Sequence, residues 1–333
     1  AQPLPSAPMR IDLTPPEWAT HLISDLDDWL RAPRPVAELA PFELPDDAYF
    51  EYAYLDAAGE KRPDPTNPNE PLNPWWPYAR HLAGPAYAPD PWAQVPEKEA
   101  PQGTTHRLKL TSEHLGQERH VLVYTPRGHA EKKLPQVWFQ DGKAFYGWGK
   151  TPQVLDRLLE AGQCAPARLI FIPPVSRTLE YHFNDSYLAF LTEELLPEVE
   201  RLAPSTGHRT AWGASMGGLC SAELAWRHPL RFQAVVAQSG AFLFHPGQHA
   251  GDDPHGGQEW WAGRVESEAW RPLRWHLQTG TLEWLHRPNA NLAAALREAD
   301  YEVQYQERSS GHNWTTWRDG LAAGFRFAVP RRT

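Results

Sequence analysis

The segment TAWGASMGGLCSAELAWRHP, residues 210–229, holds Ser215 inside a G-x-S-x-G pattern. An apolar stretch precedes the serine, and apolar residues follow it at helical spacing up to Pro229. A nucleophile elbow requires this strand–turn–helix context, because the sharp turn has no room for side chains beside the serine and pushes its hydroxyl outward. Ser215 is therefore the candidate nucleophile, and a structural turn of small residues is the alternative.

A serine hydroxyl needs a base, and after such an elbow the chain order is serine, acid, histidine. His312 lies in SSGHNWTTW, after the last expected strand and before the last expected helix. Loops at the carboxyl ends of strands converge in an open α/β sheet, which makes His312 the candidate base. Glu283 is the first carboxylate after the strand LRWHLQTG and is the favoured acid, with Asp252 or Asp253 as the alternative. The acid would fix the histidine tautomer and stabilise the imidazolium.

Two backbone N–H groups must stabilise the oxyanion that develops on the attacked carbonyl. The N–H of Met216, directly after the serine, is the first candidate. The second should come from the loop after an early strand, where WFQDGKAF offers Lys143 as first choice and Gly142 as second. Asp141 is expected to brace this turn rather than to take part in the chemistry.

Composition and charge argue against several other functions. The chain has 333 residues and a formal net charge of −9, whereas a nucleic-acid-binding protein needs a basic face. Cys164 and Cys220 cannot form a disulfide framework, and Cys220 is expected to be a buried apolar residue. The irregular spacing of His245, His249 and His255 favours surface positions over a metal site. Neither a metal nor a cofactor is expected.

No long apolar run is present, so no transmembrane helix is expected. The first residues, AQPLPSAPMR, do not have the pattern of a signal peptide. The expected location is the cytoplasm, or the periplasm or exterior if a signal peptide has been removed. The expected partner is a small-molecule ester, not a nucleic acid or a membrane.

The distribution of prolines divides the chain in two. The first 101 residues hold 20 of the 34 prolines, and strand-like segments such as AYFEYAYLDAAGEKR lie among them. These features predict a small β-sandwich and an extended linker over residues 1–103. Over residues 104–333, strand-like runs such as ARLIFIPP alternate with helical segments. This alternation predicts an α/β fold with a mostly parallel central sheet.

Two segments of the C-terminal part have clear features of helices. TPQVLDRLLEAG is expected to begin with Thr151 as its N-cap and to stop at Gly162. DSYLAFLTEELLPEVERLA, residues 185–203, is expected to form one amphipathic helix, because it places Leu191, Leu195, Val199 and Leu202 on one helical face.

Several of these motifs together resemble a known family. FQDGKAF, SRTLEYHFNDSYLAFLTEELLP, GASMGGL, SGAF, GTLEW and GHNWTTWRDGL occur in this order in the esterase D superfamily, and the chain looks most like its enterochelin-esterase branch. LISDLDDW, LPDDAYFEYAYLD and DPTNP resemble the early-set β-sandwich that precedes the hydrolase domain in that branch. The resemblance implies an α/β-hydrolase with Ser215 as nucleophile, His312 as base and an acid at Glu283.

The resemblance also implies a substrate. The typical substrate of the branch is a ferric tricatecholate siderophore, a trianion that is cleaved at its serine-trilactone esters. Arg177 and Glu180 match an R-x-x-E pattern that resembles a structural or substrate-facing pair of the family, and Lys143, Arg264 and Arg271 are further basic candidates. The superfamily also includes feruloyl and acyl-sugar esterases and acyltransferases, which remain alternatives.

Tryptophan side chains offer surfaces for ring stacking. Trp260 and Trp261 lie in the long, glycine-rich loop 241–264, which is a candidate lid, and Trp314 follows His312 closely. We expect these indoles to contact substrate rings, with packing under the loop as the alternative. A glycan-binding protein on a degenerate hydrolase fold is the alternative without catalysis, and the complete serine–acid–histidine set argues against it.

Overall fold

The structure is a computed structural model that describes residues 8–71, 76–248 and 260–331. The chain forms two compact units. The first consists of Ala1–Pro89, Thr279–His286 and Glu307–Arg318, and the second of Asp90–Gln278, Arg287–Gln306 and Asp319–Thr333. This division differs from the boundary expected near residue 103, because two short C-terminal segments belong to the N-terminal unit.

In the described part of residues 8–89, the first unit consists of short strands and a 3₁₀ turn. They are β1 (Met9–Ile11), β2 (Ala19–Ser24), β3 (Arg34–Pro35), η1 (Val36–Glu38), β4 (Phe42–Leu44), β5 (Tyr49–Asp56), β6 (Lys61–Arg62) and β7 (Arg80–Ala83). Strand β5 lies between β2 on one side and β6 and β7 on the other, all antiparallel to it, while β1 and β4 form a separate two-stranded sheet.

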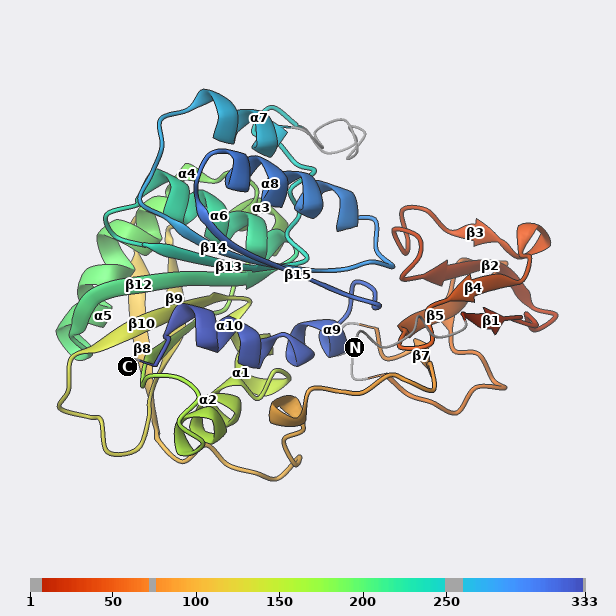
Figure 1. Cartoon of the computed structure of the whole chain (residues 1–333), viewed down its shortest axis with the longest axis horizontal. Helices are drawn as coiled ribbons and strands as arrows, with labels where there is room; N and C mark the ends of the chain where they lie inside the picture. Colours follow the sequence, from red (N-terminus) through yellow and green to blue (C-terminus); the bar gives the residue numbers. More distant parts are fainter. Residues whose placement is uncertain (1–7, 72–75, 249–259, 332–333) are drawn as a thin grey trace, which may run out of the picture. The chain divides into compact units, whose positions relative to one another are not determined.

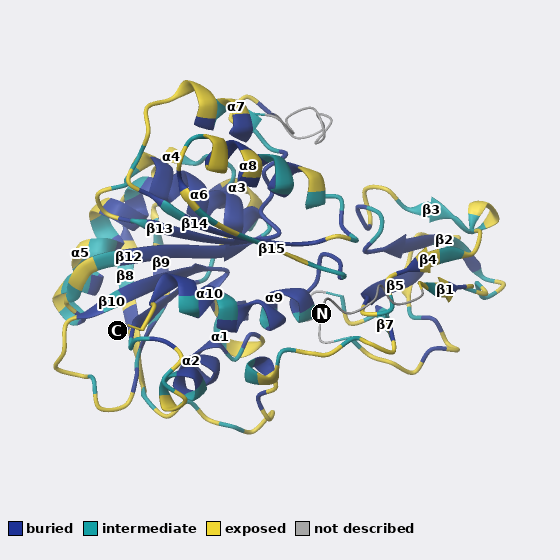
Figure 2. Ribbon diagram, in the orientation of Figure 1, coloured by how far each residue is buried: buried dark blue, intermediate teal, exposed yellow. Residues whose placement is uncertain are grey.

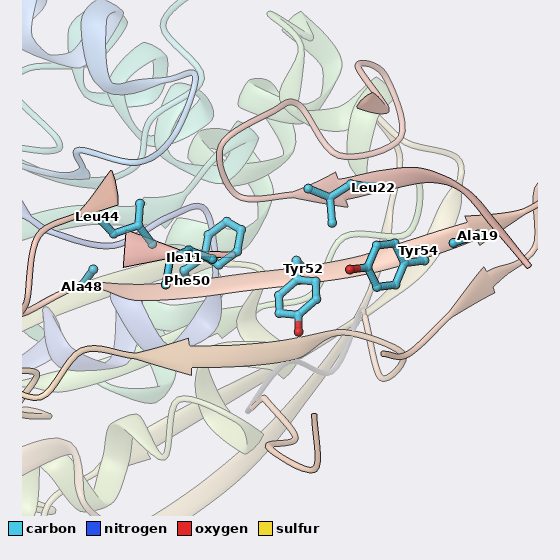
Figure 3. Close-up of a cluster of buried hydrophobic side chains, with 8 residues drawn as sticks. All are labelled: Ile11, Ala19, Leu22, Leu44, Ala48, Phe50, Tyr52 and Tyr54. Atoms are coloured by element: carbon cyan, nitrogen blue, oxygen red, sulfur yellow. The ribbon is translucent and has the colours of Figure 1, made fainter. Parts of the chain in front are cut away.

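Strand β5 is buried on both faces, and its side chains alternate between two clusters. Phe50, Tyr52 and Tyr54 pack with Ile11 of β1 and other apolar residues, as Figure 3 shows. Ala53 and Leu55 pack into a second cluster on the opposite face. The two-residue period of a strand explains this separation, since successive side chains point to opposite faces of the sheet. The expected small sheet domain is thus present.

The second unit is built on an eight-stranded sheet. Its strands are β8 (Thr104–Ser112), β9 (Gln117–Thr125), β10 (Leu134–Gln140), β11 (Arg168–Ile172), β12 (Ser205–Ala214), β13 (Ala234–Gln238), β14 (Arg274–Gly280) and β15 (Glu302–Arg308). They are ordered β15-β14-β13-β12-β10-β11-β9-β8. The neighbouring strands from β11 through β10, β12 and β13 to β14 pair in parallel, whereas β9 pairs antiparallel with both β11 and β8. The predicted α/β fold with a mostly parallel sheet is confirmed.

Helices cover both faces of this sheet. The helices that follow β7 in the described residues are η2 (Pro91–Ala93), α1 (Gly142–Gly147), α2 (Thr151–Glu160), α3 (Arg177–Tyr181), α4 (Asp185–Ala189), the π-helical η3 (Phe190–Leu195), α5 (Leu196–Leu202), α6 (Met216–Arg227), α7 (Trp260–Ser267), α8 (His286–Glu298), α9 (Trp314–Asp319) and α10 (Leu321–Ala328). Of these, α9 belongs to the first unit except for its last residue. Within the second unit, α6 and α8 lie over one face, and α2 and α10 lie over the other (Figure 1).

A row of aromatic side chains fills the core under the sheet. Phe171, Phe139 and Trp212 are register partners on β11, β10 and β12, and their ring centroids lie 5.1 and 5.0 Å apart. Phe325 of α10 packs against Trp212 at 5.2 Å. Figure 2 shows the resulting burial of the central strands, which matches their continuous apolar sequences.

Two details of the helices differ from expectation. Thr151 does not cap α2: Lys150 is the N-cap residue, with φ of 50°, and the Thr151 hydroxyl instead donates to the Phe145 carbonyl. The segment 185–203 is not one α-helix, because the π-helical η3 separates α4 from α5. Pro197 follows η3 and has no N–H for an i→i−4 bond, which accounts for the widened turn before it. Within the described ranges, none of the helices has the length and apolar character needed to cross a lipid bilayer.

Candidate active site

Ser215 stands at the turn between β12 and α6 in a strained conformation. Its φ is 56° and its ψ is −124°, a region that residues with a Cβ atom rarely occupy. The backbone holds it there: the Ser215 N–H donates to the Gln238 carbonyl at 2.9 Å, and the Ser215 carbonyl accepts from Gly218, Leu219 and Ala241 at 3.0 to 3.1 Å. Its hydroxyl does not cap α6, as a serine at an N-cap commonly does. The turn therefore presents the hydroxyl rather than using it for the helix.

Gly213 makes this turn possible. A Cβ atom on Gly213 would lie 2.1 Å from the carbonyl oxygen of Gly217, so no other residue fits without moving the start of α6. The sequence pattern predicts glycine here because the turn has no room for a Cβ atom, and the structure shows this lack of room at Gly213.

The candidate oxyanion donors lie on two helix starts in the same unit. The Met216 N–H belongs to the first turn of α6, and the N–H groups of Gly142 and Lys143 belong to the first turn of α1. Amides in a first turn have no acceptor within the helix, and the helix dipole adds positive potential there. A Cβ atom on Gly217 would lie 3.0 Å from Asp141 Oδ2, so the two turns adjoin.

Asp141 braces the turn before α1. It adopts a left-handed conformation with φ of 53°, and its N–H donates to the Tyr181 hydroxyl at 2.7 Å. Arg177 donates to both carboxylate oxygens of Asp141 at 2.7 and 2.8 Å, and to the Ala214 carbonyl at 3.3 Å. Arg177 thus ties the α1 turn to the strand end that carries Ser215, while about a third of its side chain stays exposed.

Glu180 does not pair with Arg177. Both of its carboxylate oxygens accept from Arg119 of β9, at 2.7 and 3.0 Å, and they also accept from the N–H groups of Val175 and Ser176. The side chains of Glu180 and Arg119 are 5% and 1% exposed. Arg177 and Glu180 share α3 but have different partners, since Arg177 donates to Asp141 and Glu180 accepts from Arg119. Of the two roles implied for Glu180, the structural one fits this buried ion pair with Arg119.

Glu283 and His312 meet in the first unit. Glu283 follows β14 and His312 follows β15, and Glu283 Oε2 lies 2.5 Å from His312 Nδ1. The other oxygen, Oε1, accepts from the Thr279 hydroxyl at 2.9 Å and the Gly280 N–H at 2.8 Å. With the carboxylate ionised, His312 carries its proton on Nδ1, which leaves Nε2 as the atom able to accept another.

Two indoles enclose the His312 ring. Trp284 lies 4.6 Å away between ring centroids, and Trp317 packs edge-on at 5.1 Å. Neither was identified from the sequence, although Trp284 is adjacent to the candidate acid in GTLEW. The alternative acids Asp252 and Asp253, and also His249 and His255, lie outside the described residues.

The expected aromatic substrate contacts are mostly core residues. Trp261 and Trp314 are each 1% exposed, so their assignment as stacking surfaces for a substrate is not supported by this structure. Trp261 packs against Trp226 and Phe242, and Trp314 packs against Trp317. Their burial among other aromatic rings agrees with the alternative interpretation, in which these indoles are packing residues. Trp260 is partly exposed and packs on Phe183.

Two of the basic candidates are already engaged. Arg264 pairs with Glu223 and Glu268 and lies over three indoles of the second unit. Arg271 pairs with Glu268 and stacks on Trp226 at 4.2 Å. Among the basic candidates, Lys143 is exposed and Arg177 is partly exposed beside the elbow.

Among the described residues, no group of three or more His, Cys, Asp or Glu side chains is arranged to hold a metal ion. Both cysteines are buried thiols. Burial raises the pKa of Cys164 to about 12 and raises that of Cys220 as well, so neither has the character of a reactive thiolate.

The central sheet and the strained serine at its strand–helix turn define an α/β-hydrolase fold. The chain belongs to the family described as "Putative esterase", which matches residues 112–328.

Curated relatives and solved structures agree with this assignment. The chain is 28% identical over 235 residues to the "Iron(III) enterobactin esterase" of Escherichia coli strain K12, covering 68% of this chain and 57% of that protein. It therefore spans little more than half the length of the curated relatives it matches.

The ferric enterobactin esterase structure from Salmonella typhimurium superposes with a TM-score of 0.73 at 22% identity, covering 92% of this chain and 87% of that one. A ferulic acid esterase structure from Anaeromyces mucronatus gives 0.58 at 17% identity, covering 73% and 97%. These structural likenesses establish the fold.

Proposed function

We propose that this protein is a serine carboxylic ester hydrolase that acts through an acyl-enzyme. In this mechanism His312 Nε2 takes the proton of Ser215, whose oxygen attacks the ester carbonyl. The N–H groups of Met216 and Lys143 stabilise the oxyanion, and Gly142 is the alternative to Lys143. The alcohol leaves with the proton from His312, and water then hydrolyses the acyl-serine. Glu283 orients the imidazole and stabilises its charged form.

The backbone of Ser215 is the observation that carries this proposal. A φ of 56° is costly for a residue with a side chain, on the order of 1–3 kcal/mol. A turn that served only to connect β12 to α6 would have no reason to place a serine there, since glycine adopts this conformation without strain. The strain supports a role for the hydroxyl itself.

The proposed substrate is a ferric tricatecholate siderophore of the enterobactin type. The curated relatives named as iron(III) enterobactin esterases support this class, and the site offers cationic side chains to a trianion. Lys143 is exposed on α1, and Arg177 lies beside the serine turn. Feruloyl and acetyl-sugar esters are the alternatives within the same reaction type.

Replacing the nucleophile tests the reaction type. Ser215→Ala should lower the turnover of p-nitrophenyl acetate by about 10⁴-fold or more, because no alkoxide can form. Ser221→Ala is the matched control, since Ser221 is a fully buried serine of the same helix α6. Full activity of Ser215→Ala with an unchanged circular dichroism spectrum would exclude Ser215 as the nucleophile.

A panel of esters tests the substrate class. Ferric enterobactin, a feruloyl ester and an acetylated sugar are compared by kcat/KM, with product analysis in the presence and absence of an acceptor alcohol to detect acyl transfer. Lys143→Met should raise KM for the ferric siderophore by about fivefold, as expected for one exposed charge contact, and leave p-nitrophenyl acetate unaffected because the backbone N–H at this position is retained. Preference for the feruloyl or sugar ester would replace the siderophore as the proposed substrate.

A further inference from the structure

The loop that carries His312 is attached to the N-terminal strands of the same unit. The N–H of Tyr49, the first residue of β5, donates to the Ser309 carbonyl at 2.8 Å, and Tyr49 forms a parallel bridge with Ser310. The Ser310 carbonyl in turn accepts from the N–H of Leu282, at 3.1 Å. Backbone bonds thus join β5, the histidine loop and the acid loop in one network.

Asp25 lies directly beneath the histidine loop. It follows β2, is fully buried, and its Oδ2 accepts from the Glu51 N–H at 2.8 Å and from Asn313 Nδ2 at 2.9 Å. A Cβ atom on Gly311 would lie 2.1 Å from Asp25 Cγ, so the loop backbone rests on the carboxyl group. Residues on either side of His312 therefore contact one side chain of the N-terminal sheet.

Asn313 can satisfy its amide only in this orientation. Its Oδ1 accepts from the Thr316 N–H at 2.9 Å, and a backbone N–H is a donor only. Asn313 Nδ2 must therefore point the other way, toward Asp25, and Asn313 has no exposed surface where water could replace that acceptor. Loss of the Asp25 carboxyl group would leave a buried donor without its partner.

The acid loop is held by the same sheet. Leu282 packs against the cluster on one face of β5, and Trp284 packs against the cluster on the other face. Glu283 lies between them in the chain, and its carboxylate contacts His312. Both partners of the Glu283–His312 pair are thus supported by the N-terminal strands.

We propose that Asp25 is a positioning residue for His312, acting through Asn313 and the backbone of Gly311. This inference rests on the proposed function, because the position of His312 matters for turnover only if His312 is the base. Misplacement of a catalytic group by about 1 Å can cost around 100-fold in rate, so a carboxyl group that sets the loop position has a kinetic effect without touching the substrate.

Two variants approach the contact from opposite sides. Asp25→Ala and Asn313→Ala should each lower kcat by about 10- to 100-fold with little change in KM, because the base is displaced while substrate binding is retained. The double variant should be no slower than the slower single variant, as expected for two residues that act through one contact. Asp25→Asn keeps an oxygen acceptor in place and should recover most of the lost rate.

The matched control is Asp64→Ala. Asp64 is also a buried acid of the N-terminal domain, and it accepts from the Tyr52 hydroxyl at 2.7 Å and from the N–H and hydroxyl of Thr66. Asp64→Ala should lower Tm as Asp25→Ala does, yet leave kcat unchanged when both are assayed well below their Tm. Equal kcat for the Asn313 and Asp64 alanine variants would overturn the positioning role, and this comparison remains available if Asp25→Ala is too unstable to assay.

A spectroscopic measurement separates this inference from the proposed function. The His312 Nδ1 proton, bound to Glu283, should give a downfield proton resonance that disappears in His312→Gln. Asp25→Ala and Asn313→Ala should shift or broaden it, and Asp64→Ala should not. If the wild-type protein hydrolysed no ester, the proposed function would be refuted. The resonance would still show whether Asp25 and Asn313 position His312. An unchanged resonance together with an unchanged kcat would refute the positioning role alone.

Discussion

The two oxygens of Glu283 have different partners. Oε1 is held by the Thr279 hydroxyl and the Gly280 N–H, and Oε2 contacts His312 Nδ1. A carboxylate anchored through one oxygen cannot rotate away from the imidazole, so the histidine keeps one tautomer and one ring orientation. This arrangement fits the orienting role that we propose for Glu283 as the acid of a serine–histidine–acid set.

Replacing Glu283 by glutamine tests that role. Glu283→Gln should lower kcat by roughly 10²- to 10⁴-fold, because an amide cannot stabilise the imidazolium and can impose the wrong tautomer. Glu307→Gln is the matched control, since Glu307 makes a 2.8 Å contact with His286 on the exposed surface of the same unit. Steady-state kinetics at neutral pH make the comparison, and equal rates for the two variants would point to a serine–histidine dyad.

The cysteines give a second test at this scale. Burial raises the pKa of Cys164 to about 12 and that of Cys220 also rises, so both thiols stay protonated near neutral pH. A thiol reagent such as dithionitrobenzoate should label neither cysteine of the native protein at pH 8, and both after unfolding. Rapid labelling of the native protein would contradict the buried environment of these side chains.

Candidate chemical groups can be selected from this sequence more readily than the residues that support them. Ser215, Glu283 and His312 could be selected because each follows a recognisable strand, and the contact between Glu283 and His312 is present. Asp25 could not be selected, because its partner Asn313 lies 288 residues away in the chain. No local pattern encodes so distant a contact.

At the scale of elements, the turn between β12 and α6 depends on close backbone approach. The start of α6 lies so near Gly213 that even one methyl group would collide with the Gly217 carbonyl. Neighbouring strands fix the other side, since β12 pairs in parallel with both β10 and β13. The strain at Ser215 is therefore maintained by packing on both sides of the turn.

A single methyl group should disrupt this turn. Gly213→Ala should reduce kcat by at least about 100-fold and lower Tm, because α6 must move to relieve a 2.1 Å contact. Gly263→Ala is the control: Gly263 lies in helix α7 with nothing within 4 Å of a Cβ atom, so alanine should keep activity and slightly raise Tm. An active Gly213→Ala enzyme would show that the elbow tolerates a side chain there.

The strands could be predicted more securely than the helix ends. Strands β11 and β13 are continuous apolar runs, a pattern that is typical of parallel strands buried on both faces. The prediction of Thr151 as the N-cap of α2 is wrong, because the Thr151 hydroxyl donates to the Phe145 carbonyl and does not bind an N–H group of the helix. Cap residues follow local chemistry only where no tertiary contact competes for the side chain.

At the scale of the whole molecule, the units are not contiguous in sequence. The segments Thr279–His286 and Glu307–Arg318 belong with the N-terminal strands, although they directly follow strands of the central sheet. The proline content falls where the N-terminal strands give way to the central sheet, but it does not show which later segments belong to the first unit. The boundary expected near residue 103 could therefore not capture this division.

The buried Asp25 makes the stability of this assembly depend on pH. Burial, and then the negative charge of Glu51, raise the pKa of Asp25 well above its usual value of 3.8, with Glu283 adding to the effect and the hydrogen bonds from Glu51 N–H and Asn313 opposing it. A raised pKa in the folded state means that the stabilising contribution is complete below the ordinary pKa and is lost as the pH rises through the folded pKa.

Asp25→Asn, which cannot ionise, should therefore gain Tm relative to the wild-type protein as the pH is raised from about 4 to about 8, by roughly 2–5 °C. Asp56→Asn gives the opposite sign. The pKa of Asp56 is lowered by hydrogen bonds from the Glu60 and Ala58 N–H groups and by Arg62, so that variant should lose Tm relative to wild type at neutral pH and approach it as the pH falls. Scanning calorimetry across this range measures both differences. A constant difference between wild type and Asp25→Asn would mean that Asp25 titrates like an exposed carboxyl, and the histidine loop would then rest on a charged rather than a protonated support.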